Sequence, residues 1–174
     1  IPPRAFLNGI SRAKEKLIAP DRYSREAASF FEEQVSRVYP AYQARLTKAS
    51  ALDFDDILGY AVRLLESSEA TREKYQERFL SVLVDEVQDV NFTQYRFAQL
   101  VSGKHKNISI VGDDDQSIYG WRGADVSLML QFASDFPGAK VITLEQNYRS
   151  TKKILEAAYH VIRHNRSRTD KRLW

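Results

Sequence analysis

Apolar residues recur at helical spacing through the first half of the chain. They fall into three groups: Phe6, Ile10 and Leu17; Ala27, Phe30, Phe31 and Val35; and Phe54, Ile57, Leu58, Ala61 and Leu65. Spacings of three, four and seven place such residues on one face, so each group predicts an amphipathic helix. Pro20 and Pro40 are expected to separate these helices, and Asp53 stands where an N-cap would precede the third.

Short β-branched apolar runs replace this pattern from about residue 80 onward. Leu80–Val84, Ile108–Val111 and Val141–Leu144 are each followed by acidic or glycine residues. Helical patterns near Thr93–Val101 and Ala124–Phe132 separate the three runs. Strands that alternate with helices predict buried parallel strands and an α/β fold.

A final helix is the most clearly patterned element. Ser150 or Thr151 is suited to cap it, and its apolar stripe consists of Ile154, Leu155, Ala158, Val161 and Ile162. His160 and His164 lie four residues apart on this helix, but no third ligand of suitable type accompanies them, so surface histidines are the better interpretation.

Composition narrows the choice of partner only slightly. With 26 basic and 23 acidic residues the net charge is +3, which permits nucleic acid binding without requiring it. The excess lies after Tyr148, in Arg149, Lys152, Lys153, Arg163, Arg166, Arg168, Lys171 and Arg172, a basic tail that we expect near phosphates. The sequence has no cysteine and no apolar run of membrane-spanning length, so we expect a cytoplasmic protein without a membrane partner.

Two acidic residues follow the first predicted strand directly. Open α/β sheets bind ligands at the carboxyl ends of their strands, where Asp85 and Glu86 would lie. A carboxylate there can hold Mg²⁺ while its neighbour orients or deprotonates a water, and we assign Asp85 to the metal and Glu86 to the water. The alternative is a turn with solvated charges, the better account of an isolated Asp-Glu pair.

Three strings in order carry a family resemblance. Val84–Asn91 resembles the Walker B motif of UvrD/Rep-like superfamily-one DNA helicases, Gly112–Ala124 resembles the next motif of that family, and Leu144–Thr151 resembles its fourth. Leu52–Asp56 and the closing Lys171–Trp174 are similar to further family segments, so the resemblance covers most of the chain from Leu52. Val87 and Val90 depart from the aromatic residue and the threonine of many relatives.

The resemblance implies roles around ATP. Gln116 would contact the γ-phosphate or the attacking water, Arg149 would act as an arginine finger, and Tyr148 would stack on adenine. Asp113 and Asp114 have a weaker claim to the same site. The structural alternatives are that Gln116 stabilises a turn and that Arg149 is an ordinary surface residue.

The resemblance also implies contacts with single-stranded DNA. Tyr119 and Trp121 would stack on bases, and Arg122 would couple the nucleotide state to the grip on the strand. Core packing is the usual alternative for a tryptophan, but the glycine-flanked loop favours stacking. Phe54 fits either a DNA contact or a core position.

One family element is absent from the sequence. None of the seven glycines begins the Gly-x-x-x-x-Gly-Lys-Ser/Thr loop that cradles ATP phosphates, and Gly103-Lys104 lacks the upstream glycine. We therefore expect an internal fragment of a P-loop NTPase (RecA-like) motor, inactive by itself and marginally stable or oligomeric. Residues 1–50 would belong to an inserted helical subdomain, residues 51–144 to part of the first motor domain, and residues 145–174 to the start of the second.

By resemblance the full-length protein is an ATP-dependent 3′–5′ DNA helicase acting in repair or replication. ATP, Mg²⁺, single-stranded DNA and duplex junctions are the implied ligands, and repair or replication proteins are the implied partners. Two alternatives stay open: the helicase portion of a recombination nuclease-helicase, and a helicase-like DNA-binding module without ATPase activity.

Overall fold

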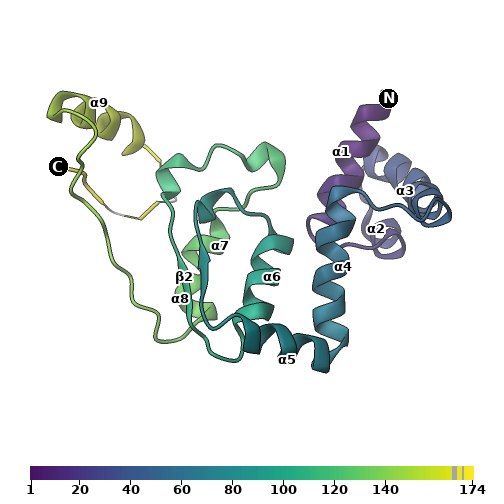
Figure 1. Ribbon diagram of the computed structural model, residues 1–174. Coiled ribbons are helices and arrows are strands. Elements are labelled where there is room, and N and C mark those ends of the chain that lie inside the picture. Colours follow the sequence, from purple (N-terminus) through teal and green to yellow (C-terminus); the bar gives the residue numbers. More distant parts are fainter. Residues whose placement is uncertain (166–167, 170) are drawn as a thin grey trace.

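The N-terminal part of the protein is entirely helical in the computed structural model (Figure 1), which describes residues 1–165, 168–169 and 171–174. The helices of residues 1–78 are α1 (Pro3–Lys14), α2 (Pro20–Glu26), α3 (Phe30–Lys48), α4 (Phe54–Ser67) and α5 (Glu69–Arg78). The helical character is therefore confirmed, although these fully described residues form more helices than the three predicted.

Helix α3 contradicts the expected break at Pro40, which lies inside it. Proline removes one backbone hydrogen bond from a helix interior, and this helix tolerates the loss because other contacts hold it. Ser29 and Glu32 form a capping box at its start, and Val35 and Tyr39 are buried on its inner face. Asp53 is the N-cap of α4, as predicted, with Asp56 completing a second capping box.

Two clusters of buried apolar residues lie within the described part of the chain. Ile10 and Ala13 of α1 pack with Val35 and Tyr39 of α3. The second cluster joins α4 to the helix α6 (Phe92–Ser102) and consists of Val62, Leu65, Leu100 and Val101. Helix α4 thus connects the N-terminal helices to the part of the chain that carries the strands (Figure 1).

Two short strands form a parallel sheet within the described residues. Strand β1 (Val82–Val84) pairs with β2 (Ile108–Ile110) in a register that sets Val82 beside Ile108, and α6 is the crossover between them. The predicted parallel arrangement is confirmed, but the prediction that the strands are buried on both faces of the sheet is wrong. Side chains alternate between faces along a strand, so Leu83 lies on the open face and is 67% exposed.

The third predicted strand does not form. Val141, Ile142 and Leu144 lie in an irregular segment and are 78–80% exposed. An apolar run forms a strand only when a neighbouring strand pairs with its backbone N–H and C=O groups. Here the backbone hydrogen bonds lie just after the run, where the Trp174 N–H donates to the Glu145 carbonyl (3.0 Å) and the Asn147 N–H donates to the Trp174 carbonyl (2.8 Å).

The remaining helical elements follow the sheet. The predicted helix near residues 124–132 is two short helices, α7 (Ser127–Leu130) and α8 (Phe132–Asp135). Helix α9 (Lys152–Ile162) begins after Thr151 as predicted, but its apolar stripe is uncovered, with Val161 74% exposed. In the described part of the chain, every helix is too short or too polar to cross a bilayer.

Candidate functional site

The predicted pair of carboxylates lies at the carboxyl end of β1. Both Asp85 and Glu86 are exposed, and Glu86 takes a left-handed backbone conformation with φ of 50°. The turn is anchored behind them, because the Val87 N–H donates to the Val111 carbonyl at 3.0 Å. The two carboxylates therefore lie at the carboxyl end of the strand, where open α/β sheets bind ligands.

A buried glutamine joins this turn to the end of β2. Gln88 is 2% exposed, its Nε2 donates to Glu86 Oε2 at 2.8 Å, and its Oε1 accepts from the Asp113 N–H at 3.0 Å. Gln88 was not among the site residues predicted from the sequence. The only signal that marks it is its place two residues after Glu86 in the Walker B-like string.

Gln116 completes this row of polar groups. It ends a 3₁₀ turn, η2 (Asp114–Gln116), and its Nε2 donates to Asp113 Oδ2 at 2.7 Å. The structure thus brings together Glu86 and Gln116, two of the predicted catalytic residues, through Gln88 and Asp113. Gln116 itself is exposed and accessible to a ligand.

The acidic run beside it, Asp113–Asp115, forms ion pairs with two residues of the basic tail. Lys171 contacts Asp113 at 2.5 Å and also Asp114, and Arg168 contacts Asp115 through two hydrogen bonds of 2.8 and 2.9 Å. Burial opposes ionisation of Asp113, but the hydrogen bonds from Lys171 and Gln116 outweigh it, so the pKa of Asp113 is lowered. These members of the basic tail contact carboxylates, while Arg166 lies outside the described residues.

The two groups of carboxylates differ in how they suit Mg²⁺. Oxygen atoms are the ligands that this cation prefers, and the exposed Asp85 and Glu86 offer them at the strand edge. Carboxylate oxygens of Asp113, Asp114 and Asp115 lie within 4.8 Å of one another, but they already form ion pairs with Lys171 and Arg168. The strand-end carboxylates therefore fit the cation better.

The aromatic residues predicted to stack on bases are exposed. Trp121 is 68% exposed on the turn η3 (Gly120–Arg122), with the ring of Tyr119 6.4 Å away. The Arg122 guanidinium lies over both rings, at 5.2 Å from Trp121 and 5.8 Å from Tyr119. Phe54, the first residue of α4, is 91% exposed, so the core interpretation of Phe54 is wrong.

Tyr148 and Arg149 lie just before α9. Asn147 Oδ1 accepts from the backbone N–H groups of Arg149 (2.9 Å) and Ser150 (2.7 Å), which fixes the turn, and Tyr148 is 87% exposed. Among the described residues, no hydrogen bond or ion pair links Tyr148 or Arg149 to Glu86 or Gln116.

The described residues thus combine a parallel sheet whose strands are followed by acidic residues with an exposed aromatic loop. Residues 2–137 match the UvrD/REP helicase N-terminal domain, and the chain belongs to this family. It is 49% identical over 172 residues to the ATP-dependent DNA helicase PcrA of Staphylococcus epidermidis, and 45% identical to the proteins of that name from Leuconostoc citreum and Bacillus subtilis strain 168. These alignments cover 99% of this chain but only 23–24% of the relatives, so the chain spans about a quarter of their length.

Proposed function

We propose that this chain is part of an ATP-dependent DNA helicase that couples ATP hydrolysis to 3′–5′ translocation on single-stranded DNA and to duplex unwinding in repair or replication. The observation that carries the proposal is the hydrogen-bonded row from Glu86 through Gln88 and Asp113 to Gln116. It links an acidic residue suited to water activation with an amide suited to phosphate contact, at the edge where open α/β sheets bind ligands.

The phosphate side of the site would work through this row. Asp85 would hold Mg²⁺, which supplies charge neutralisation of the phosphates when bound. Glu86 would orient or deprotonate the attacking water, and Gln88 fixes the Glu86 carboxylate toward the end of β2. Gln116 can donate and accept hydrogen bonds at once, which suits contact with both the γ-phosphate and a water.

The second motor domain would supply the remaining groups. In the proposed division, residues 1–50 end the helical insert, residues 51–144 form part of a P-loop motor domain, and residues 145–174 begin the second. Tyr148 would stack on adenine. Arg149 would present its planar guanidinium to the γ-phosphate when the two domains close.

The DNA side would consist of exposed rings. Stacking on Tyr119, Trp121 and Phe54 tolerates any base, as a translocating motor requires. Arg122 would relate strand grip to nucleotide state, because it lies over both rings of the loop that follows Gln116.

The test is the Mg²⁺-ATPase activity of the full-length protein that contains this chain, with and without single-stranded DNA. We expect strong stimulation by DNA, a loss of at least about a hundredfold in kcat for Glu86→Gln, and a blunted response to DNA for Trp121→Ala. Phe30→Ala removes another exposed ring, 71% exposed on α3, and serves as the matched control with wild-type stimulation. A wild-type protein without DNA-stimulated activity contradicts the proposal.

A further inference from the structure

The C-terminal end of α1 is bonded to the start of α6. Thr93 is 2% exposed, and its Oγ1 donates to the carbonyl of Lys14 (3.2 Å) and to that of Glu15 (2.7 Å). Its backbone N–H also donates to the Glu15 carbonyl at 3.1 Å. Carbonyls at a helix C-terminus lack partners within the helix, so these bonds fix where α1 ends. We call Lys14 and Glu15 the α1 junction.

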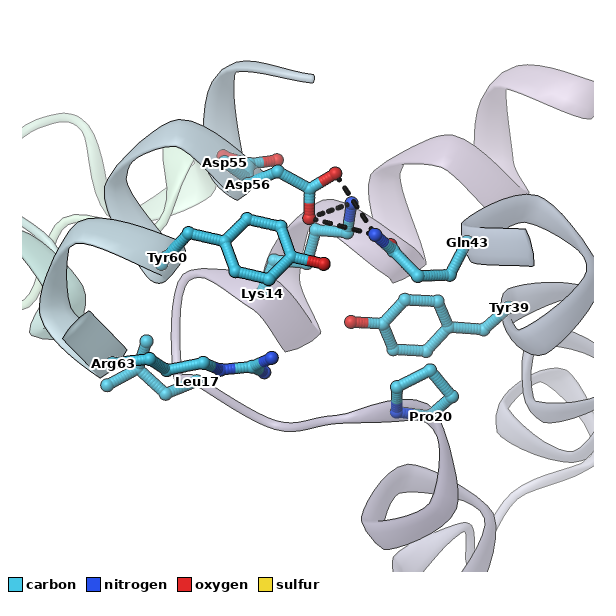
Figure 2. A pocket seen from close by; sticks show the side chains of 10 residues that line it. Lys14, Leu17, Pro20, Tyr39, Gln43, Asp55, Asp56, Tyr60 and Arg63 are labelled. Carbon is cyan, nitrogen blue, oxygen red and sulfur yellow. Dashed lines mark hydrogen bonds and ion pairs between the residues drawn. The ribbon is translucent and has the colours of Figure 1, made fainter. Parts of the chain in front are cut away.

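The side chain of Lys14 is buried against the start of α4. It is 6% exposed, and its Nζ lies 2.6 Å from Asp53 Oδ2 and 2.8 Å from Asp56 Oδ1. Figure 2 shows the Lys14 ammonium group and the Gln43 amide converging on the Asp56 carboxylate. The Tyr42 hydroxyl donates to Asp53 Oδ2 at 2.9 Å. Removing one partner of such a buried ion pair leaves uncompensated charge, so Lys14 strongly constrains both carboxylates.

These two carboxylates bracket Phe54. Asp53 is the N-cap of α4 and Asp56 its third residue, and each accepts from the backbone N–H of the other. Phe54 is the first residue of α4, directly after the N-cap, and its ring is 91% exposed. The direction in which the ring projects is therefore set by a cap that Lys14 holds.

The other residue of the α1 junction contacts the aromatic loop. Gly123 closes the Tyr119–Gly123 loop with φ of 86°, and the Glu15 carboxylate fills the space that a Cβ at this position would need. Burial and the nearby Asp55 raise the pKa of Glu15, which agrees with a close-packed carboxyl group. The α1 junction thus contacts the N-terminal cap of α4 through Lys14 and the Tyr119–Gly123 loop through Glu15.

We infer that Lys14 is a positioning residue for DNA: the α1 junction holds Phe54 and the Tyr119–Gly123 loop in one arrangement, so that their rings form a single base-stacking surface. This inference rests on the proposed function. Lys14 would then contribute to the binding of single-stranded DNA without contacting DNA itself. Loss of Lys14 then weakens DNA binding only by displacing the ring of Phe54.

A double-mutant cycle separates this role from general stability. The measured quantity is the Kd of the full-length protein for a fluorescent single-stranded oligothymidylate, for wild type, Lys14→Met, Phe54→Ala and the double variant. We expect Phe54→Ala to weaken binding by about tenfold, the loss of one stacked base. Lys14→Met should weaken it by several-fold, and the double variant should bind no worse than Phe54→Ala, because the two changes act through the same ring.

Matched variants decide the remaining outcomes. Arg96→Met breaks the Arg96–Glu66 ion pair at the other end of α4 and should leave the Kd unchanged in both backgrounds. If Lys14→Met does not fold, the cycle is run with Tyr42→Phe, which removes one bond to Asp53 and should give a smaller loss that also vanishes with Phe54→Ala. Losses that multiply in the double variant overturn the inference. A wild type that binds DNA without stimulated ATPase overturns the proposed function instead, while the cycle still reports on Lys14.

Discussion

Gly112 is confined by the residues that link the two strand ends. A Cβ at this position would lie 2.5 Å from Gln88 Oε1 and 2.8 Å from Val87 Cγ1, so a methyl group would displace both. We expect Gly112→Ala to lower the free energy of unfolding by about 1–3 kcal/mol, as overpacking does in a closed site. The measurement is chemical denaturation of the variant and the wild type.

Gly120 provides the control for the Gly112→Ala substitution. A Cβ there meets no atom within 4 Å, so Gly120→Ala should leave stability within about 0.5 kcal/mol of wild type. Equal stabilities for the two alanine variants would show that Gln88 moves freely and does not fix the turn.

The cap of α4 depends on the ionised carboxylate of Asp53 and should therefore respond to acid. Burial raises the pKa of Asp53, but hydrogen bonds from Lys14, the Asp56 N–H and Tyr42 outweigh it, and the net pKa is lowered. A lowered carboxyl pKa stabilises the fold above the unfolded value of about 3.9, and this contribution is lost as pH falls through the folded pKa. Stability should therefore drop below about pH 4.

Tyr42→Phe tests this account of the cap. It removes one bond to the carboxylate, so the free energy of unfolding at pH 7 should fall by about 1 kcal/mol and the loss between pH 5 and pH 3 should be smaller. Tyr60→Phe, on α4 itself, is the control and should keep the wild-type pH dependence. An unchanged acid response in Tyr42→Phe would remove Asp53 as its source.

Elements whose signals are local were predictable from the sequence. The N-cap at Asp53, the helix α6 and the two parallel strands follow from residues within one turn or one strand. The run at 141–144 has the same local signal as the two strands, but a strand also needs a neighbour, which the pattern does not contain. The contact of Lys14 with Asp53, 39 residues away, and the burial of Gln88 have no periodic signature either.

At the scale of the whole molecule, exposed apolar side chains occur along the described chain, and three of them, Val141, Ile142 and Leu144, lie within one irregular segment. Ile142 and Leu144 are 78% and 80% exposed, and Leu83 on the open sheet face is 67% exposed. Contiguous apolar surface promotes association. We expect the isolated chain to scatter light as a species larger than its 20.1 kDa monomer at micromolar concentration.

Polar substitutions identify the surface responsible. Ile142→Asp with Leu144→Asp should shift the isolated chain toward the monomer, because charge opposes apolar contact. The same change at the exposed Glu145 and Gln146, each to Asp, adds no such protection and is the control. A wild-type chain that is a stable monomer would contradict the prediction.

The burial of Gln88 has a consequence for solvent exchange. Its single amide group is shared by the Glu86 carboxylate and the Asp113 N–H, and it is 2% exposed. The amide proton of Asp113 can therefore be replaced by deuterium only when this shared group opens, and opening also releases Glu86. The exchange rate of the Asp113 backbone proton, which follows β2, thus reports how often the Glu86 carboxylate, which follows β1, is held in place by Gln88.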